Sequence, residues 1–226
     1  MTKYFTKTDL ALWLGSVLVI TASFLAFDRV GYLTYASSLI GVTSLIFNAK
    51  GSPIGPLLMV IFSIIYGIIS YGCRYYGEML TYVGMTAPMA LISLIAWLRH
   101  PFKGDRSQVQ VNEISRREWV FMLLLTAAVT FVFYFILKFF NTANLLWSTL
   151  SVTTSFAAVY LSFRRSAYYA LFYAANDVVL IVLWALVMQT DISYLSVMIC
   201  FVVFFVNDLY GFVSWKRMRA RQQRTG

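Results

Sequence analysis

The sequence predicts an all-α integral membrane protein with eight transmembrane helices. The chain has 226 residues, of which 60% are hydrophobic and 12% are charged, and its mean hydropathy is +0.74. Soluble domains contain about 25% charged residues, so this composition excludes an ordinary soluble fold. Apolar runs long enough to cross a bilayer recur along the whole chain, and basic residues are concentrated in alternate loops between them.

The predicted spans are apolar runs separated by short polar or turn segments. The second run is short and contains small polar residues such as Ser37 and Ser44, and the fourth contains Pro88, which predicts a kink. No small-residue cleavage site lies ahead of Asp28, so we expect an uncleaved first helix instead of a signal peptide. The eight spans lie at about 9–27, 33–49, 54–72, 77–98, 118–139, 144–162, 166–189 and 193–215.

Basic residues are distributed unevenly between the two sides of the predicted bundle. Of the 18 Lys and Arg residues, 15 lie in the terminal segments and in alternate loops. The three on the opposite side are Arg29, Arg74 and Lys138. Because positively charged loops stay in the cytoplasm, we expect both termini there. The net charge of +9 therefore reflects topology and attraction to membrane lipid, and no nucleic-acid partner is expected.

The chain contains a faint internal repeat. A displacement of 118 residues places Trp97 on Trp215 and Arg99 on Arg217, so the fourth span overlays the eighth. Parallel three-helix repeats related by an axis along the membrane normal are the plan of SWEET-type transporters. We therefore expect a SWEET-like 3+1+3 repeat. It comprises a peripheral first helix in 1–30, a first repeat in 31–100, a loop and linker helix in 101–140, a second repeat in 141–215 and a basic tail in 216–226.

The span at 166–189 places polar groups in the middle of the membrane. Asn176 lies ten residues from its start, hence about 15 Å deep in a hydrocarbon core about 30 Å thick. An Asp at a helix centre costs roughly 2.5–3.5 kcal/mol, so Asp177 should face a cavity or a partner. Tyr169, Phe172 and Tyr173 precede Asn176 at helical spacing. This face predicts a binding site for a flat ligand with polar edges; the alternative is interhelical packing.

The last span contains a second Asn-Asp pair, Asn207 and Asp208, with Phe204 on the face of Asn207. We expect Asn207 and Asn176 to bind one ligand across a shared cavity; the alternative is that the two amides bond each other. Glu78 lies about one turn into its helix, and we expect it to be solvated. Further candidates for substrate binding in the first repeat are Tyr66, Thr81 and Tyr82.

Residues typical of catalysis or metal binding are scarce. Cys73 and Cys200 have neither metal-ligand nor redox spacing, and the one histidine, His100, lies at a helix end beside Pro101. The predicted spans contain no histidine and no metal-ligand cluster, which argues against a membrane-embedded enzyme. We expect no cofactor and no metal. A partner-binding membrane subunit without a ligand stays open as an alternative.

Three segments resemble the PnuC family of vitamin-precursor transporters. They are Asn-Ala-Lys-Gly at 48–51, Arg-Tyr-Tyr-Gly-Glu at 74–78 and Asn-Asp-Leu-Tyr-Gly-Phe-Val-Ser-Trp at 207–215. The resemblance covers the second to eighth spans. It implies a SWEET-like repeat, a homotrimer in a bacterial inner membrane, and facilitated diffusion of nicotinamide riboside. A cytosolic kinase then traps the substrate by phosphorylation.

The same resemblance bears on the substrate. The signature of the PnuC family is two tryptophans three residues apart and an asparagine four residues further on. In this sequence these positions hold Tyr169, Phe172 and Asn176. Stacking is retained, but the indole N–H donors are lost. Thiamine, riboflavin and deoxynucleosides, which similar proteins carry, therefore stay open as substrates. A proton-coupled symporter that uses Asp177 or Asp208 as a relay is the alternative in mechanism.

Overall fold

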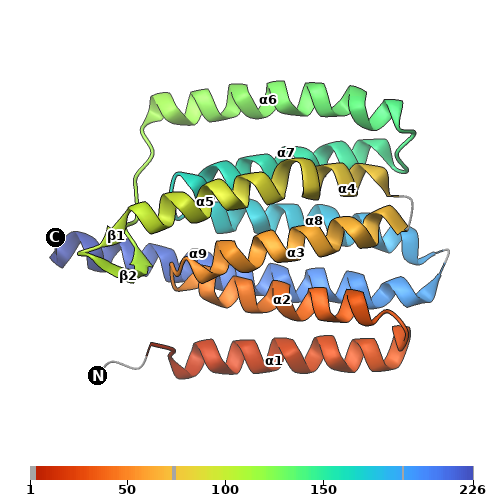
Figure 1. Ribbon diagram of the computed structural model, residues 1–226, viewed down its shortest axis with the longest axis horizontal. Helices are drawn as coiled ribbons and strands as arrows, with labels where there is room; N and C mark the ends of the chain where they lie inside the picture. Colours follow the sequence, from red (N-terminus) through yellow and green to blue (C-terminus); the bar gives the residue numbers. More distant parts are fainter. Residues whose placement is uncertain (1–3, 73–74, 190, 226) are drawn as a thin grey trace.

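The computed structural model describes residues 4–72, 75–189 and 191–225; Lys3, Cys73 and Arg74 lie outside them. Its long helices run along the longest axis of the molecule, as Figure 1 shows. The first residues of α1, a small β-hairpin and the end of α9 lie at the same end of this axis. The uninterrupted long helices are α1 (Lys7–Ser23), α2 (Tyr32–Ala49), α3 (Ile54–Gly72), α6 (Arg116–Phe139), α7 (Leu145–Phe163), α8 (Tyr169–Met188) and α9 (Leu195–Thr225).

The fourth predicted helix is interrupted. It consists of α4 (Tyr76–Thr81), a π-helical turn η2 (Tyr82–Thr86) and α5 (Ala87–Arg99), with Pro88 in the first turn of α5. Proline has no N–H to donate to the preceding turn, and π-helical turns concentrate at such irregularities and at functional sites. Two shorter segments flank other helices: the π-helical turn η1 (Phe24–Asp28) ends α1, and the 3₁₀ turn η3 (Ile192–Tyr194) precedes α9.

The loop after α5 contains a hairpin that the sequence did not predict. Strands β1 (Pro101–Phe102) and β2 (Asp105–Val109) pair antiparallel. The Val109 N–H donates to Gly51 O at 2.9 Å, and Gln222 Nε2 donates to Val109 O at 3.0 Å. Because Gln222 fastens to the hairpin, α9 continues to Thr225, ten residues beyond the predicted span. The basic tail is therefore the last part of a helix.

Six helical segments form a closed ring, and two helices lie outside it. Around the ring, α2 packs on α3, α3 on α5, α5 on α7, α7 on α8, α8 on α9, and α9 on α2. Helix α1 packs against α2 and α9, and α6 against α7, so these two lie on opposite edges of the bundle (Figure 1).

Two tryptophans join the halves of the ring at the hairpin end. Trp97 Nε1 donates to Ser162 O at the end of α7 (2.9 Å), and Trp215 Nε1 donates to Asn48 O at the end of α2 (2.7 Å). The two indoles contact each other at a centroid distance of 5.2 Å. These are the tryptophans that the displacement of 118 residues superimposes, and they make equivalent bonds in the two halves.

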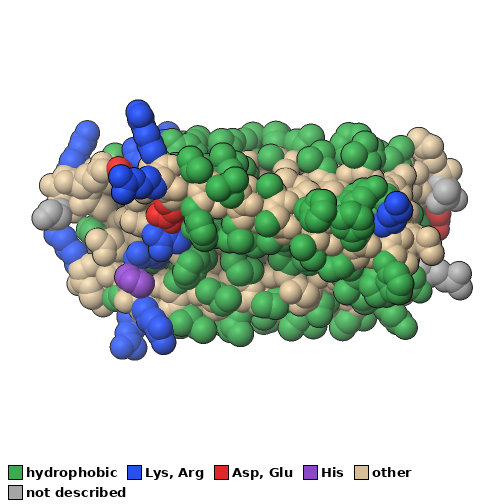
Figure 2. All heavy atoms as spheres, turned by 90° about the horizontal axis from the view of Figure 1, so that it is seen from above, with side chains coloured by type: hydrophobic (Ala, Val, Ile, Leu, Met, Phe, Trp, Pro, Cys, Tyr) green, Lys and Arg blue, Asp and Glu red, His purple; other side chains and the backbone are tan. Residues whose placement is uncertain are grey.

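The surface is that of a membrane protein. Within the described residues, seven helices are long and apolar enough to cross a bilayer; α2 is not among them because its polar residues lower its hydropathy. Several of those polar groups, including Ser37 and Ser44, are buried inside the bundle. Only 17% of the α6 span is buried, against 61% of the α7 span. In Figure 2 a band of hydrophobic side chains covers the middle, and Lys and Arg gather at the hairpin end.

Candidate functional site

A small cavity lies inside the helix ring, about midway along the bundle. Its volume is about 20 Å³, which is enough for one water and far too small for a nucleoside. Residues from α2, α3, η2, α7, α8 and α9 meet here, so every helix of the ring except α5 itself contributes. They are Leu45, Met59, Phe62, Tyr82, Thr86, Ser155, Tyr173, Asn176, Asp177, Phe201, Phe204 and Asp208.

The amide of Asn176 is held by hydroxyl groups from a neighbouring helix. Its Oδ1 accepts hydrogen bonds from Thr154 Oγ1 at 2.8 Å, Ser155 Oγ at 3.0 Å and Ser151 Oγ at 3.4 Å. Tyr82 in η2 lines the same cavity as Asn176. The three hydroxyl contacts connect α8 with α7, so the amide is fixed at the cavity wall.

Two carboxyl groups lie beside this amide. Asp177 on α8 and Asp208 on α9 are each 4% exposed. Both carboxyl groups line the same small cavity. Asp177 Oδ2 is buried and has no hydrogen-bond partner. The cavity therefore combines an amide, two acids and hydroxyl groups, which are the groups that recognise polar ligand edges.

Aromatic rings form much of the rest of the wall, together with Leu45 and Met59, and further aromatic rings lie toward both ends. Phe62 lies 5.7 Å from Phe204 and 6.0 Å from Tyr82, measured between ring centroids. Toward the hairpin end, Tyr169 packs on Trp215 at 4.9 Å. Toward the opposite end, Trp184 Nε1 donates to the Tyr66 hydroxyl at 2.9 Å. Tyr169 and Trp184 are fifteen residues apart on α8, hence about 22 Å, so the cavity is enclosed between two aromatic layers.

The chain resembles proteins that have been characterised by sequence and by structure. The family model described as nicotinamide mononucleotide transporter matches residues 31–217. The chain belongs to this family. The expected membership of the PnuC family is therefore confirmed, and the match excludes α1, which lies outside the ring.

Individual relatives agree with the family assignment. The nicotinamide riboside transporter PnuC of Neisseria mucosa is 24% identical over 216 residues, which cover 93% of this chain and 82% of the relative. The protein of the same name from Haemophilus influenzae is 22% identical over 191 residues, covering 84% and 81%. A crystal structure of the vitamin B3 transporter PnuC superposes with a TM-score of 0.83 at 19% identity, covering 96% of this chain and 94% of that chain. That structure shares the fold.

Five of the ten predicted site residues line the central cavity. They are Tyr82, Tyr173, Asn176, Asp177 and Phe204.

The other five predicted residues lie elsewhere. Tyr66 and Tyr169 belong to the two aromatic layers, and Thr81 Oγ1 donates to Gly77 O within its own helix at 2.8 Å. Phe172 packs on Trp119 of α6 at 6.2 Å, outside the ring. Asn207 is described next.

We had expected Asn207 to meet Asn176 across the cavity, but the structure places it elsewhere. Its Nδ2 donates to Ser16 Oγ of α1 at 2.9 Å and to Val203 O at 2.8 Å. Successive residues of a helix point about 100° apart, so Asp208 takes the inward position and Asn207 faces α1. The prediction chose the wrong member of the second Asn-Asp pair.

Glu78 was predicted to be solvated at the start of its helix, and this prediction is wrong. It is 1% exposed, and neither carboxylate oxygen has a hydrogen-bond partner. The prediction assumed that a position near the end of the span is exposed to water. In the structure α4 packs against α3 and α7, and Glu78 is buried there. Among the cavity residues, Ser155 had no signal in the sequence. Asp208 was predicted only as a possible proton relay, although its position directly after an Asn, like that of Asp177, was an available signal for ligand binding.

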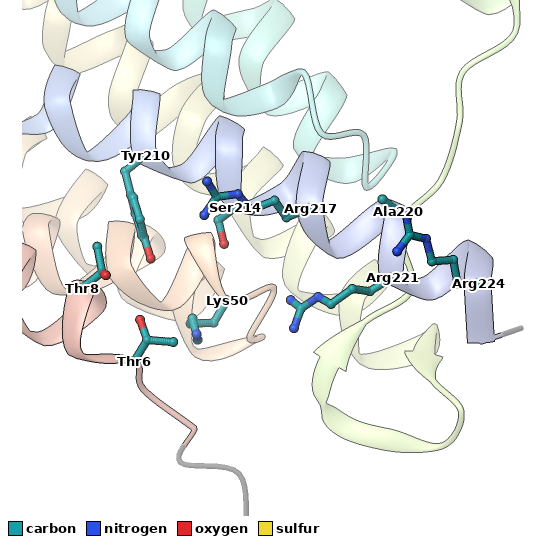
Figure 3. A pocket seen from close by; sticks show the side chains of 9 residues that line it. All are labelled: Thr6, Thr8, Lys50, Tyr210, Ser214, Arg217, Ala220, Arg221 and Arg224. Atoms are coloured by element: carbon teal, nitrogen blue, oxygen red, sulfur yellow. The ribbon is translucent and has the colours of Figure 1, made fainter.

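A second, larger pocket of about 540 Å³ lies outside the ring, between α1, α2 and α9 (Figure 3). Lys50 lines it together with three arginines of the α9 tail and with polar side chains from both ends of the chain: Arg217, Arg221, Arg224, Thr6, Thr8 and Ser214. Lys50 Nζ contacts Asp9 Oδ2 at 2.8 Å, and the Tyr210 hydroxyl donates to Asp9 Oδ1 at 2.5 Å. These bonds attach α1 to the bundle. The pocket faces a peripheral helix that lies outside the family match, so the central cavity is the stronger candidate.

Proposed function

We propose that the protein imports nicotinamide riboside, or a closely similar nucleoside-like vitamer, by facilitated diffusion. The single observation that supports this most is the polar cavity at mid-bundle in a member of the nicotinamide mononucleotide transporter family. Two relatives named nicotinamide riboside transporters align over most of the chain. The proposed activity is that of a carrier, not of an enzyme.

The proposed architecture is eight spans in a 3+1+3 parallel repeat plus a peripheral first helix. The ring supports it: the contacts α2–α3, α3–α5 and α5–α7 correspond one by one to α7–α8, α8–α9 and α9–α2. The equivalent bonds of Trp97 and Trp215 follow the same correspondence. Helix α2 has 18 residues and is therefore about 27 Å long, close to the hydrocarbon thickness, so we count it as a span.

The proposed orientation puts both termini and the hairpin in the cytoplasm of a bacterium, with the protein in its inner membrane. The gathering of Lys and Arg at the hairpin end supports this orientation. The segments proposed from sequence keep their boundaries, with the last one, 216–226, continuing as α9.

The proposed chemistry matches the ligand to the cavity wall. Nicotinamide riboside has a flat cationic ring, a carboxamide and a ribose. Amide and hydroxyl groups of Asn176, Thr86 and Ser155 pair with a carboxamide or with ribose hydroxyls, and aromatic faces attract a desolvated cation by up to about 2 kcal/mol. Because the cavity is closed and small, the three-helix units must move apart to admit a ligand, which is alternating access.

The wider assignment rests on the family resemblance. We propose a homotrimer in contact with membrane lipid, and a cytosolic kinase that phosphorylates the imported substrate and keeps it inside. Tyr169 and Phe172 stand where the family signature has tryptophans, so thiamine, riboflavin and deoxynucleosides remain competing substrates. Proton coupling through Asp177 or Asp208 is the competing mechanism, and the position of both acids at the wall of one cavity is the observation in its favour.

A ligand screen tests the proposal. Purified protein is heated with nicotinamide riboside, thiamine, riboflavin or deoxynucleosides, and the unfolding temperature is recorded for each. A ligand that binds only the folded state at 100 times its Kd adds about 2.7 kcal/mol of stability, so the true substrate raises the unfolding temperature. Absence of stabilisation by every compound would contradict the proposed function.

A further inference from the structure

The interior of the bundle contains acids without matching bases. Among the described residues, the buried members of the charged classes are Asp9, Glu78, Asp177 and Asp208. No described lysine or arginine is buried. Asp9 has Lys50 as its partner at the rim. The other three acids lie within the ring, and no residue that lines the central cavity is basic.

Asp177 and Asp208 cannot both be ionised in the empty protein. Both carboxyl groups are buried at the wall of one cavity of about 20 Å³ that no basic residue lines, and two like charges so placed disfavour each other's ionised form. The pair therefore holds at least one proton. Asp177 Oδ2 remains without a hydrogen-bond partner at the cavity wall, and a buried unsatisfied oxygen of this kind is costly unless a ligand meets it.

The groups that face this pair from the other helices are neutral or apolar. Tyr82 comes from η2, Tyr173 from α8 and Cys200 from α9, and all three lie within electrostatic reach of Asp177. Tyr169 lies within electrostatic reach of Asp208, and Glu78 within electrostatic reach of Tyr82. Helices α2 and α3 contribute Leu45, Met59 and Phe62, and α7 contributes Ser155. None of these side chains supplies a positive charge.

We propose that the Asp177–Asp208 pair is the counter-ion site for an organic cation and that the cation competes with the shared proton. This deepens the proposed function and rests on it, because it assigns a charge to the substrate of the same cavity. When a cation with charge +1 binds, the pair loses one proton to the water on the open side. The total charge in the cavity is then the same before and after binding.

A counter-ion site of this kind selects its ligands by charge. A neutral ligand leaves the proton on the pair and gains only stacking and hydrogen bonds. A cationic aromatic ring gains attraction both from the carboxylates and from the faces of rings such as Tyr173 and Phe204. Permanently charged vitamers, such as a pyridinium riboside or a thiazolium, should therefore bind better than neutral ones of similar shape.

The first experiment uses the unchanged protein and one matched ligand pair. Nicotinamide riboside and its reduced dihydropyridine form share the ribose and the carboxamide, but only the first is cationic. Titration calorimetry at one pH in two buffers of different ionisation enthalpy counts the protons released. We expect about one proton per nicotinamide riboside and none for the reduced form. Over the pH range in which the pair holds its proton, Kd for the cation should rise about tenfold for each unit by which the pH falls.

The outcomes separate the two proposals. Binding of nicotinamide riboside without proton release, and with the same Kd as its reduced form, would overturn the counter-ion site and leave the proposed function intact. Failure of nicotinamide riboside, thiamine and every other cation in the panel to bind would overturn both. Proton release with a cation other than nicotinamide riboside supports the counter-ion site and changes the substrate.

Variants then locate the effect. Asp177→Asn and Asp208→Asn should each weaken binding of the cation about ten- to a hundredfold, while Kd for the reduced form changes much less. Asp105→Asn, in the exposed hairpin, is the matched control and should bind like the unchanged protein. Thermal unfolding checks that each variant is folded. Folded variants that keep the full preference for the cation would overturn the assignment to this pair.

Discussion

Replacement of Asn207 by leucine should lower the stability of the empty protein and leave substrate affinity unchanged. The Asn207 Nδ2 group makes two hydrogen bonds, to Ser16 Oγ of α1 and to Val203 O of its own helix. Asn207 Oδ1 has no partner, so its removal costs nothing. The main loss is the bond to Ser16, whose buried hydroxyl is left unpaired, and we expect about 1–2 kcal/mol.

Asn176→Leu is the informative companion because that amide lines the cavity. Three hydroxyl groups of α7 lose their acceptor, although Thr154 keeps a bond to Leu150 O at 3.0 Å. We expect a loss of about 1–3 kcal/mol of stability and, in addition, ten- to a hundredfold weaker binding, since a ligand group is also left unpaired.

The assay measures two quantities for each variant: the unfolding temperature of the empty protein and the Kd of the folded fraction. In the double variant the stability losses should add, because the two side chains share no partner. If Asn207→Leu weakened binding tenfold at unchanged stability, Asn207 would have to face the ligand, and the separation of the two amides would be refuted.

Three further predictions follow from single contacts. Tyr173→Ala should weaken binding through loss of stacking worth about 1–3 kcal/mol, whereas Phe172→Ala, which only removes a contact with Trp119, should leave Kd unchanged; equal effects would contradict the placement of the two rings. Lys50→Met leaves Asp9 buried without its ion partner and should cost about 3 kcal/mol in an unfolding titration, and added Asp9→Asn should restore part of it. Cysteine in place of Ser107 should resist an impermeant thiol reagent in intact cells, and ready labelling would reverse the proposed orientation.

The spans could be predicted because length and hydropathy determine them. The predicted run at 54–72 coincides with α3, and the predicted irregularity near Pro88 lies beside η2. The hairpin and the extension of α9 could not be predicted. They depend on tertiary bonds such as that from Gln222 to Val109, which leave no local pattern.

The candidate site could be predicted only in part, because helical spacing fixes a face but not its neighbour. Asn176 and Asp177 were found since a carboxylate at mid-span needs an internal environment. The same spacing placed Phe172 with them, although α6 covers that side. Asn207 and Asp208 differ by one position, and only the packing of α1 against α9 decides which of them faces inward.

Transport itself is tested most directly by uptake of isotope-labelled nicotinamide riboside into proteoliposomes that contain the purified protein and no kinase. With no proton or other ion gradient imposed, the account predicts saturable entry of the substrate. Net entry stops when its internal and external concentrations are equal. Empty liposomes are the control for leakage. Entry no faster than in those liposomes would contradict the account.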